Sequence, residues 1–153
     1  MKLTSPEFLD GEEMPEKYGY MGENVNPELE LEDIPDEAES LALVFKDPDA
    51  QEAAGKTWIH WLIWNIPTDQ RVIEKDSSPG IEGETDFREK EYNGPNPPDG
   101  EHTLVFELYA LHKDLELGRG EKLDSFENAI EDNIIEKTEL KAHYPHEHST
   151  RDE

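Results

Sequence analysis

The chain has 153 residues, enough for one domain with a real core, and its 39 acidic against 14 basic residues give a net charge of −25. That charge repels nucleic-acid phosphates and anionic lipid surfaces, which argues against binding to either. The absence of cysteine excludes disulfides, thiolate metal sites and a cysteine nucleophile.

The acidic residues are spread along the chain rather than confined to one tail. Two explanations compete: a disordered acidic chain, or a folded halophilic protein in a cytosol of molar salt, where the Debye length falls to about 3 Å. Dense aromatic and aliphatic runs favour the folded protein. No apolar run reaches the roughly 18 residues of a membrane span, and the N-terminus lacks the apolar region of a signal peptide. We therefore expect a soluble cytoplasmic protein.

Three segments predict β-strands. Residues 40–46, SLALVFK, form a nearly continuous apolar run, which is typical of a strand covered on both faces. Residues 57–67, TWIHWLIWNIP, alternate with period two. One predicted face carries Trp58, His60, Leu62, Trp64 and Ile66, and the other carries Ile59, Trp61, Ile63 and Asn65. Residues 102–112 alternate likewise, with His102, Leu104, Phe106 and Leu108 opposed to Thr103, Val105, Glu107 and Tyr109. Glu107 indicates that this second face is partly solvated.

Towards the C-terminus the pattern becomes helical. Asp124 and Glu127 resemble a capping box, and Phe126, Ile130 and Ile134 recur at a spacing of four. This spacing predicts one amphipathic helix that could extend to Leu140. The closing run HYPHEHSTRDE is expected to fray, residues 145–153 in particular. Strands joined by varied Pro- and Gly-rich loops, and followed by one helix, predict a single mainly β domain over residues 1–153 with an antiparallel sheet.

Several polar residues are candidates for a site at the strand ends. Asp47 and Asp49, in the motif DPDA, have the spacing of a turn in which aspartates bond local backbone, but strand-end loops are also where sites are built. His60 lies among tryptophans, where a hydrogen-bonded core histidine is the simpler explanation. His102 ends the rigid segment YNGPNPPDGEH, residues 92–102. As a group these residues are stronger candidates for a site than each is alone. A carboxylate can hold one nitrogen of an imidazole ring while the second nitrogen faces a ligand.

Other groups of residues are weaker candidates for a functional site. His143, His146 and His148 could bind a transition metal, but a short polar terminal run is more often solvated. No segment has the composition of a phosphate-cradling loop, and no serine lies in a G-x-S-x-G elbow. We expect no metal and no cofactor.

The segments DPDA, WIHWLIWNIP, YNGPNPPDGEHTLVFELYAL and LELGRGEKLDSFENAI resemble, in order and spacing, the phosphatidylethanolamine-binding protein family, also called the Raf kinase inhibitor family, in its bacterial and archaeal branch. The resemblance covers residues 5–144 and includes two specific motifs, D-P-D-A and G-P-x-P-P-x-G-x-H. It implies a β-sandwich-like fold with antiparallel sheets, Greek-key connections and a small C-terminal helical part. It also implies a pocket for phosphate-like or carboxylate anions.

Carried over by motif, the resemblance implies a set of ligand-binding residues: Asp47, Asp49, Trp58, His60, Gly94, Pro97, Pro98, His102 and, as a closing group, Tyr144. The chain departs from the family pattern at Gln51, where a proline is usual, and at Thr103 and Leu104, where arginine and tyrosine are common. Period two turns position 103 away from His102, so losing the arginine spares the pocket. Leu104 shares the face of His102 and costs the site a hydroxyl.

The expected function is a non-enzymatic binding module. Its expected partners are a small anionic or phosphorylated ligand, a protein such as a kinase, and a second copy in a homodimer. The alternative is a hydrolase or lyase in which His60 and His102 act as acid and base and Asp47 orients them.

Overall fold

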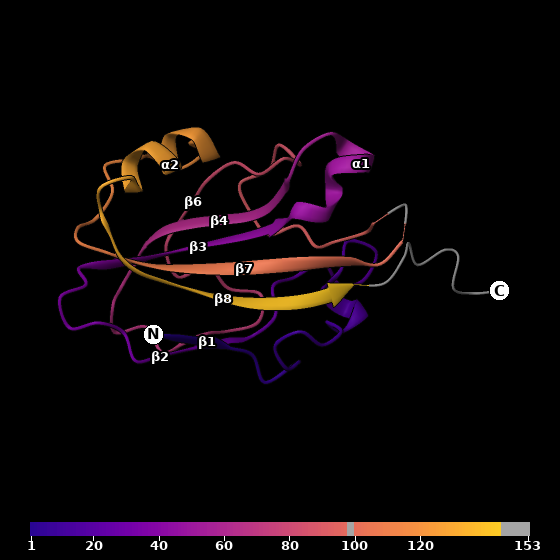
Figure 1. Cartoon of the computed structure of the whole chain (residues 1–153), viewed down its shortest axis with the longest axis horizontal. Helices are drawn as coiled ribbons and strands as arrows, with labels where there is room; N and C mark the ends of the chain where they lie inside the picture. Colours follow the sequence, from indigo (N-terminus) through magenta and orange to yellow (C-terminus); the bar gives the residue numbers. More distant parts are fainter. Residues whose placement is uncertain (98–99, 145–153) are drawn as a thin grey trace.

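In residues 1–97 and 100–144, the part of the chain that the computed structural model describes, eight β-strands form two sheets (Figure 1). The larger sheet has five strands in the order β6-β4-β3-β7-β8, and the smaller has three in the order β1-β2-β5. The larger sheet contains β3 (Ser40–Asp47), β4 (Trp58–Ile66), β6 (Ile81–Glu82), β7 (His102–Leu111) and β8 (Ile134–Tyr144). The smaller contains β1 (Lys2–Thr4), β2 (Leu29–Glu32) and β5 (Val72–Ile73). The helices are α1 (Gln51–Ala54), α2 (Leu123–Ile130) and the 3-10 turns η1 (Glu16–Tyr18) and η2 (Pro48–Ala50).

The topology confirms a mainly β fold with antiparallel sheets. Every pair of neighbouring strands runs antiparallel. Within the larger sheet β3, β4 and β6 lie side by side, and β7 returns to the free side of β3. The resulting spatial order β7-β3-β4-β6 is that of a Greek key.

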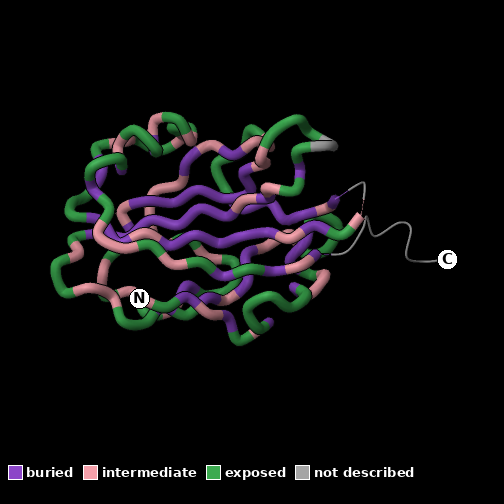
Figure 2. Tube along the Cα trace, in the orientation of Figure 1, coloured by how far each residue is buried: buried purple, intermediate pink, exposed green. Residues whose placement is uncertain are grey.

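The main hydrophobic core lies between the two sheets. Leu29, Leu31 and Ile73 of the small sheet pack with Phe45 and Phe106 of the large one. The phenyl rings of Phe45 and Phe106 stack with their centroids 3.9 Å apart. The central strands β3, β4 and β7 are buried along most of their length (Figure 2). The prediction that β3 is covered on both faces is therefore confirmed.

A second apolar cluster covers the outer face of the large sheet, where α2 packs. Phe126 and Ile130 of α2 join Val44, Leu62 and Trp64 of the sheet in this cluster. The predicted burial of Phe126 and Ile130 is confirmed, and it explains how one short helix is held on the sheet.

The predicted faces of β4 are wrong in part, because the strand contains irregularities. The register against β3 shifts between Phe45 and Lys46 and again between Leu41 and Leu43. Each shift places an extra residue in β4, and such a bulge moves the following side chains to the other face. Trp61 and Ile63 therefore enter the core between the sheets, whereas Leu62 and Trp64 join the outer cluster. The ring of His60 packs against Phe45, on the opposite face from Trp64.

The predicted alternation of β7 is confirmed, but Glu107 is not solvated. Its side chain is buried, and its Oε2 atom lies 3.0 Å from Nζ of Lys46 and 2.9 Å from Nζ of Lys137. The hydroxyl of Tyr109 donates to its Oε1 at 2.9 Å. Burial alone would raise the pKa of Glu107, but the two ammonium groups outweigh burial and hold it below its usual value. The carboxylate is therefore buried and paired.

The predicted C-terminal helix is too long. Helix α2 ends at Ile130, and Ile134 begins the edge strand β8. The N-cap residue is Lys122 without a side-chain cap, so the capping box at Asp124 is also wrong. His143 and Tyr144, expected to fray, end β8. Residues 145–153 lie outside the described part of the chain.

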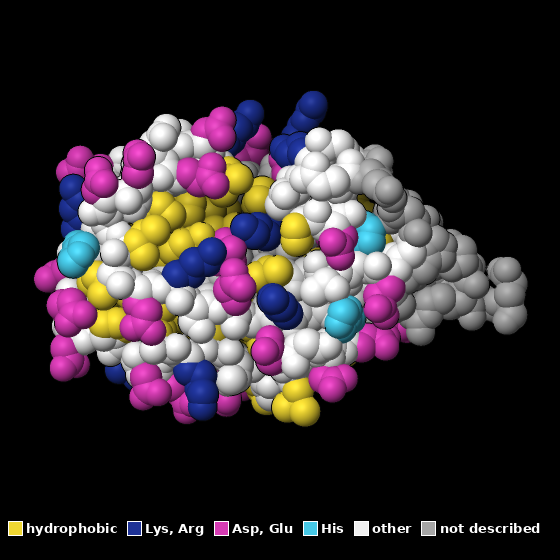
Figure 3. Space-filling model, viewed as in Figure 1, with side chains coloured by type: hydrophobic (Ala, Val, Ile, Leu, Met, Phe, Trp, Pro, Cys, Tyr) yellow, Lys and Arg dark blue, Asp and Glu magenta, His cyan; other side chains and the backbone are white. Residues whose placement is uncertain are grey.

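Acidic side chains are scattered over the visible face of the molecule, around an apolar area crossed by a few basic groups (Figure 3). No helix in residues 1–97 and 100–144 is long and apolar enough to cross a membrane.

We expect the midpoint of thermal unfolding to rise markedly between dilute buffer and molar KCl, because a net charge of −25 repels itself and salt screens that repulsion. Calorimetric melting across a KCl series measures the rise, and sucrose at matched osmolality is the uncharged control. A midpoint that stays flat in KCl, or that rises equally in sucrose, contradicts the electrostatic explanation.

Candidate functional site

Strand pairing gathers the polar residues at one end of the large sheet. Asp47 ends β3, directly opposite Trp58 at the start of β4. On the other side of β3, Lys46 pairs with Val105, which brings His102 at the start of β7 close to Asp47. A pocket of about 430 Å³ opens there. It is lined by Tyr20, Asp47, Ala50, Ala54, Trp58, His60, Phe87, Asn96, Pro97 and His102.

Asp47 holds the ring of His102. Its Oδ2 lies 2.6 Å from Nδ1 of His102, and its Oδ1 accepts the backbone N–H of Asp49 at 2.9 Å. Burial raises the pKa of Asp47 above its usual value, and the hydrogen bond with His102 offsets only part of that rise. A carboxylate on Nδ1 fixes a proton there and orients Nε2 away from itself.

His60 is a second fixed imidazole with a different charge preference. Its Nδ1 lies 2.7 Å from the carbonyl oxygen of Asn93. Because a carbonyl only accepts, Nδ1 carries the proton and Nε2 keeps its lone pair in the neutral ring. Burial lowers the pKa of His60 to about 4. At neutral pH the ring is therefore an uncharged hydrogen-bond acceptor.

Three aromatic side chains, Tyr20, Trp58 and Phe87, line the pocket. The rings of Tyr20 and Phe87 stack with centroids 5.5 Å apart, and Trp58 meets Phe87 edge-on at 5.7 Å. Tyr20 and Phe87 were not predicted as site residues. Both come from irregular segments, where periodicity gives no signal.

The loop before β7 supplies one wall of the pocket. The backbone N–H of Asn93 donates to the carbonyl of His60 at 3.1 Å, and that of Gly94 donates to Oδ1 of Asn24 at 2.7 Å. A Cβ on Gly94 would lie 2.1 Å from the carbonyl oxygen of Tyr18, so only glycine fits there. Pro97 reaches the pocket.

Three expected ligand residues lie away from the described pocket lining. Oδ2 of Asp49 accepts the backbone N–H of Thr103 at 2.9 Å. Gly94 is packed against Tyr18, and the hydroxyl of Tyr144 donates to the carbonyl of Glu16 at 3.0 Å. Pro98, also expected, lies outside the described residues.

Two of the three departures from the family pattern, Leu104 and Thr103, have different positions. Leu104 is fully buried in the core between the sheets and does not line the pocket. Thr103 turns the other way, and its hydroxyl lies 3.0 Å from Nδ1 of His143. Neither substitution exposes a new side chain to the described pocket.

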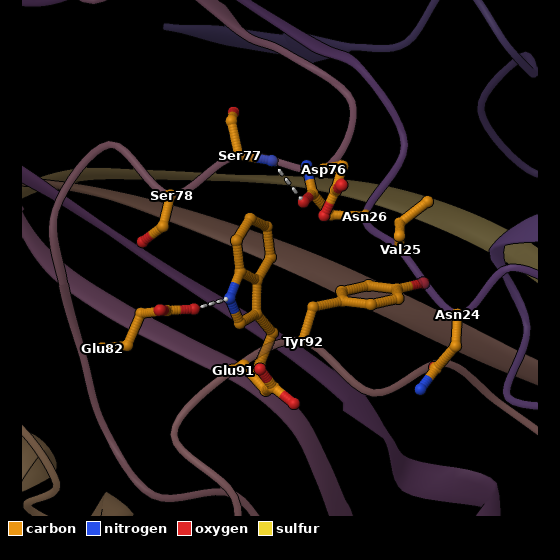
Figure 4. Close-up of a pocket in the computed structure, with 10 residues that line it drawn as sticks. Asn24, Val25, Asn26, Asp76, Ser77, Ser78, Glu82, Glu91 and Tyr92 are labelled. Carbon is orange, nitrogen blue, oxygen red and sulfur yellow. Dashed lines mark hydrogen bonds between the residues drawn. The ribbon is translucent and has the colours of Figure 1, made fainter.

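A smaller polar pocket, of about 230 Å³, lies beside Trp61 and Tyr92 (Figure 4). Two hydrogen bonds join side chains of this lining to other lining residues: Nε1–H of Trp61 donates to Oε2 of Glu82 at 2.8 Å, and Oδ1 of Asn26 accepts the N–H of Ser77 at 3.0 Å. These bonds hold β6 and the loop after β5 in place.

The described residues hold no group of three His, Cys, Asp or Glu side chains that could bind a metal ion. His143 lies in β8, with Nδ1 3.5 Å from Oε1 of Glu101. His146 and His148, the other members of the histidine run, lie outside the described residues.

Comparison with known proteins gives consistent matches. The family model described as phosphatidylethanolamine-binding protein matches residues 4–145. A UPF0098 protein of Methanothermobacter thermautotrophicus is 35% identical over 147 residues, covering 92% of this chain and 95% of the relative. Another, from Chlamydia pneumoniae, is also 35% identical and covers 94% of this chain and 98% of its own.

Solved structures agree with these matches. A crystal structure from Chlamydia trachomatis superposes with a TM-score of 0.89 at 32% identity, covering 93% of this chain and 95% of that one. The Escherichia coli protein YbcL superposes with a TM-score of 0.85 at 24% identity, covering 94% of this chain and 96% of that one, and supports the fold alone.

Proposed function

The chain belongs to the phosphatidylethanolamine-binding protein family, and from that premise we propose that its pocket binds a small anion of the phosphate-monoester type without catalysing a reaction. The supporting observation is the pair of imidazoles, His60 and His102, which line one pocket and are each held through Nδ1 by a different partner. A phosphorylated side chain of a partner protein, such as a kinase, would present the same group.

The two rings offer complementary hydrogen bonds. Neutral His60 offers an acceptor at Nε2, whereas protonation gives His102 a donor at Nε2. A phosphate monoester carrying one proton has both an O–H group and acceptor oxygens. It can therefore donate to one ring and accept from the other. Sulfate carries no proton near neutral pH, so it can only accept.

The charge of the pocket favours a singly charged anion. The described lining contains no Lys or Arg, and it includes the carboxyl group of Asp47. A phosphate monoester changes from dianion to monoanion near its second pKa, which is about 6. Protonation of the ligand and of the pocket both strengthen attraction, so binding should strengthen as the pH falls from about 8 to 6.

The alternative, acid–base catalysis by His60 and His102, is less well supported. A general acid or base works best when its pKa is near the operating pH. Burial lowers the pKa of His60 to about 4, so near neutral pH this ring neither donates a proton nor accepts one readily.

Calorimetric titration in molar KCl tests the proposal. Phosphate should bind more tightly at pH 6 than at pH 8, and more tightly than sulfate at pH 6. His102→Ala should weaken phosphate binding by about 1.5 to 3 kcal/mol, the contribution of a hydrogen bond to a charged group. His112→Ala, on an exposed ring at the far end of β7, is the matched control.

Equal phosphate binding by the native chain and the His102 variant would remove His102 from the site. Phosphoserine and phosphotyrosine titrated in parallel separate a free ligand from a protein-borne phosphate, since tighter binding of the amino acids indicates contacts beyond the phosphate.

A further inference from the structure

One side chain outside the proposed anion pocket holds the loop that orients His60. Asn24 lines the smaller polar pocket, beside Tyr92, rather than the anion pocket of about 430 Å³ (Figure 4). Its Oδ1 accepts the backbone N–H of Gly94 at 2.7 Å, and its Nδ2–H donates to Oδ1 of Asn93 at 3.1 Å. The carbonyl of Asn93 in turn lies 2.7 Å from Nδ1 of His60. Asn24 and His60 are therefore joined through a single peptide unit.

That peptide unit connects the two side chains rigidly. The carbonyl of Asn93 and the N–H of Gly94 belong to one plane, and the described residues contain no cis peptide bond. In a trans peptide the two groups point in opposite directions. An acceptor on the N–H of Gly94 therefore turns the carbonyl of Asn93 to the other side, where His60 lies. The same bond strengthens the carbonyl as an acceptor, because successive hydrogen bonds polarise one another.

The reversed orientation of this peptide unit would reverse the proton on His60. The chain is held on both sides of the unit, because the N–H of Asn93 donates to the carbonyl of His60 at 3.1 Å and the carbonyl of Pro95 accepts a backbone N–H at 3.0 Å. A half-turn of the unit keeps both bonds, and Gly94 has no side chain to oppose it. The half-turn brings the N–H of Gly94 to Nδ1 of His60. Nδ1 then accepts, and the neutral ring carries its proton on Nε2.

We propose that Asn24 is a positioning residue that fixes His60 in the Nδ1–H tautomer, and that it thereby sets the preference of the anion pocket for an oxyanion carrying a proton. The first part concerns the ligand-free chain, whereas the second rests on the proposed function. With Nε2 unprotonated, the ring accepts from the O–H group of a phosphate. In the reversed tautomer Nε2 donates instead, so a fully deprotonated anion such as sulfate gains a bond and phosphate loses its advantage.

Nitrogen NMR of the ligand-free protein at neutral pH reads the tautomer, because protonated and unprotonated imidazole nitrogens have different chemical shifts. Asn24→Gly tolerates the backbone φ of 57° and removes both side-chain bonds, so it should move His60 towards the Nε2–H tautomer. Asn24→Asp should keep the native tautomer, because a carboxylate still accepts the N–H of Gly94. Nδ2 of Asn93 is buried without a hydrogen-bond partner among the described residues, and a turn of that amide lets it donate to the new carboxylate.

Asn65→Gly is the matched control. Asn65 also has a positive φ, of 56°, and its amide makes two hydrogen bonds to the backbone of Leu115, at 3.0 and 2.7 Å. It lies at the opposite end of β4 from His60. This variant loses the same kind of bonds and should keep the native tautomer, while thermal melting checks that each variant is folded. A native tautomer in Asn24→Gly, or the same change in Asn65→Gly, overturns the positioning role.

Calorimetric titration of phosphate and sulfate at pH 6 in molar KCl tests the effect on selectivity. The ratio of the two association constants, phosphate over sulfate, should fall about three- to tenfold in Asn24→Gly, which corresponds to one hydrogen bond. Asn24→Asp and Asn65→Gly should keep the ratio at or above the native value. An unchanged ratio in a variant with a changed tautomer overturns the link to selectivity. If the native chain binds neither anion, the proposed function and that link both fail, while the tautomer still decides the role of Asn24.

Discussion

Replacing Trp64 with alanine should destabilise the fold by about 3 to 5 kcal/mol, the usual cost of removing a buried tryptophan. Trp64 is fully buried, its indole packs on Phe126 with centroids 6.1 Å apart, and its Nε1–H donates to the carbonyl of Leu117 at 3.1 Å. The substitution would leave a cavity between the sheet and α2 and would remove the hydrogen bond to the carbonyl of Leu117.

Urea unfolding in molar KCl measures the loss. Trp58→Ala is the matched control, since Trp58 is only partly buried and lines the pocket. This control should cost much less stability but weaken phosphate binding, whereas Trp64→Ala should leave the affinity of the folded protein unchanged. A loss near zero for Trp64→Ala would mean that the outer cluster contributes little to the fold.

Acid should destabilise the protein through His60 in the window from about pH 6.5 to 4. The unfolded imidazole takes up a proton near pH 6.5, whereas burial lowers the folded pKa to about 4. As the pH falls below 6.5 the unfolded chain binds a proton that the folded chain does not, so the free energy of unfolding falls. The two pKa values correspond to about 3 kcal/mol, fully lost near pH 4.

His60→Asn isolates this contribution. Asparagine can place an amide N–H near the position of Nδ1, and it does not titrate. Between pH 7 and 4.5 the native chain should lose about 2.5 kcal/mol more stability than the variant. Equal losses in the two proteins would show that His60 is not the group that is protonated.

Which side chains of β4 share a face could not be predicted from the sequence alone. An alternating pattern predicts a strand correctly, because side chains of a regular strand point to opposite faces. The bulges near His60 and Asn65 depend on the register with β3, which the residues of β4 alone do not specify. The ring of His60 therefore packs against Phe45, on the opposite face of the sheet from Trp64.

Strand β8 was mistaken for a helix for a related reason. Its outer positions are charged because that face is exposed, so no apolar run marks the strand. The inward residues Leu140, Ala142 and Tyr144 do alternate, but the spacing of Phe126, Ile130 and Ile134 extended the helical interpretation beyond its end at Ile130. An edge strand with one solvent-exposed face has only a weak apolar pattern in its sequence.

The candidate site was predictable where strand ends and motifs coincide. Four predicted residues lie in the terminal parts of β3, β4 and β7 and reach one pocket because β3 pairs with both neighbours: Asp47, Trp58, His60 and His102. Tyr20 and Phe87 come from segments without periodicity. Asp49 and Tyr144 belong to the same motif set but bond to backbone, a difference that depends on side-chain direction.

From the pairing of β3 with β7 we also expect an order in which the strands come together during folding. β3 and β4 form a hairpin closed by the short segment of η2 and α1, but Phe45 meets Phe106 only after a much longer loop closes. Folds rich in such distant pairings fold slowly, in roughly milliseconds to seconds. Asp47 belongs to the early hairpin and His102 to the late strand, so the nascent chain has a hydrophobic hairpin before it has a pocket. A bound anion would therefore act after the rate-limiting step, slowing unfolding without speeding folding.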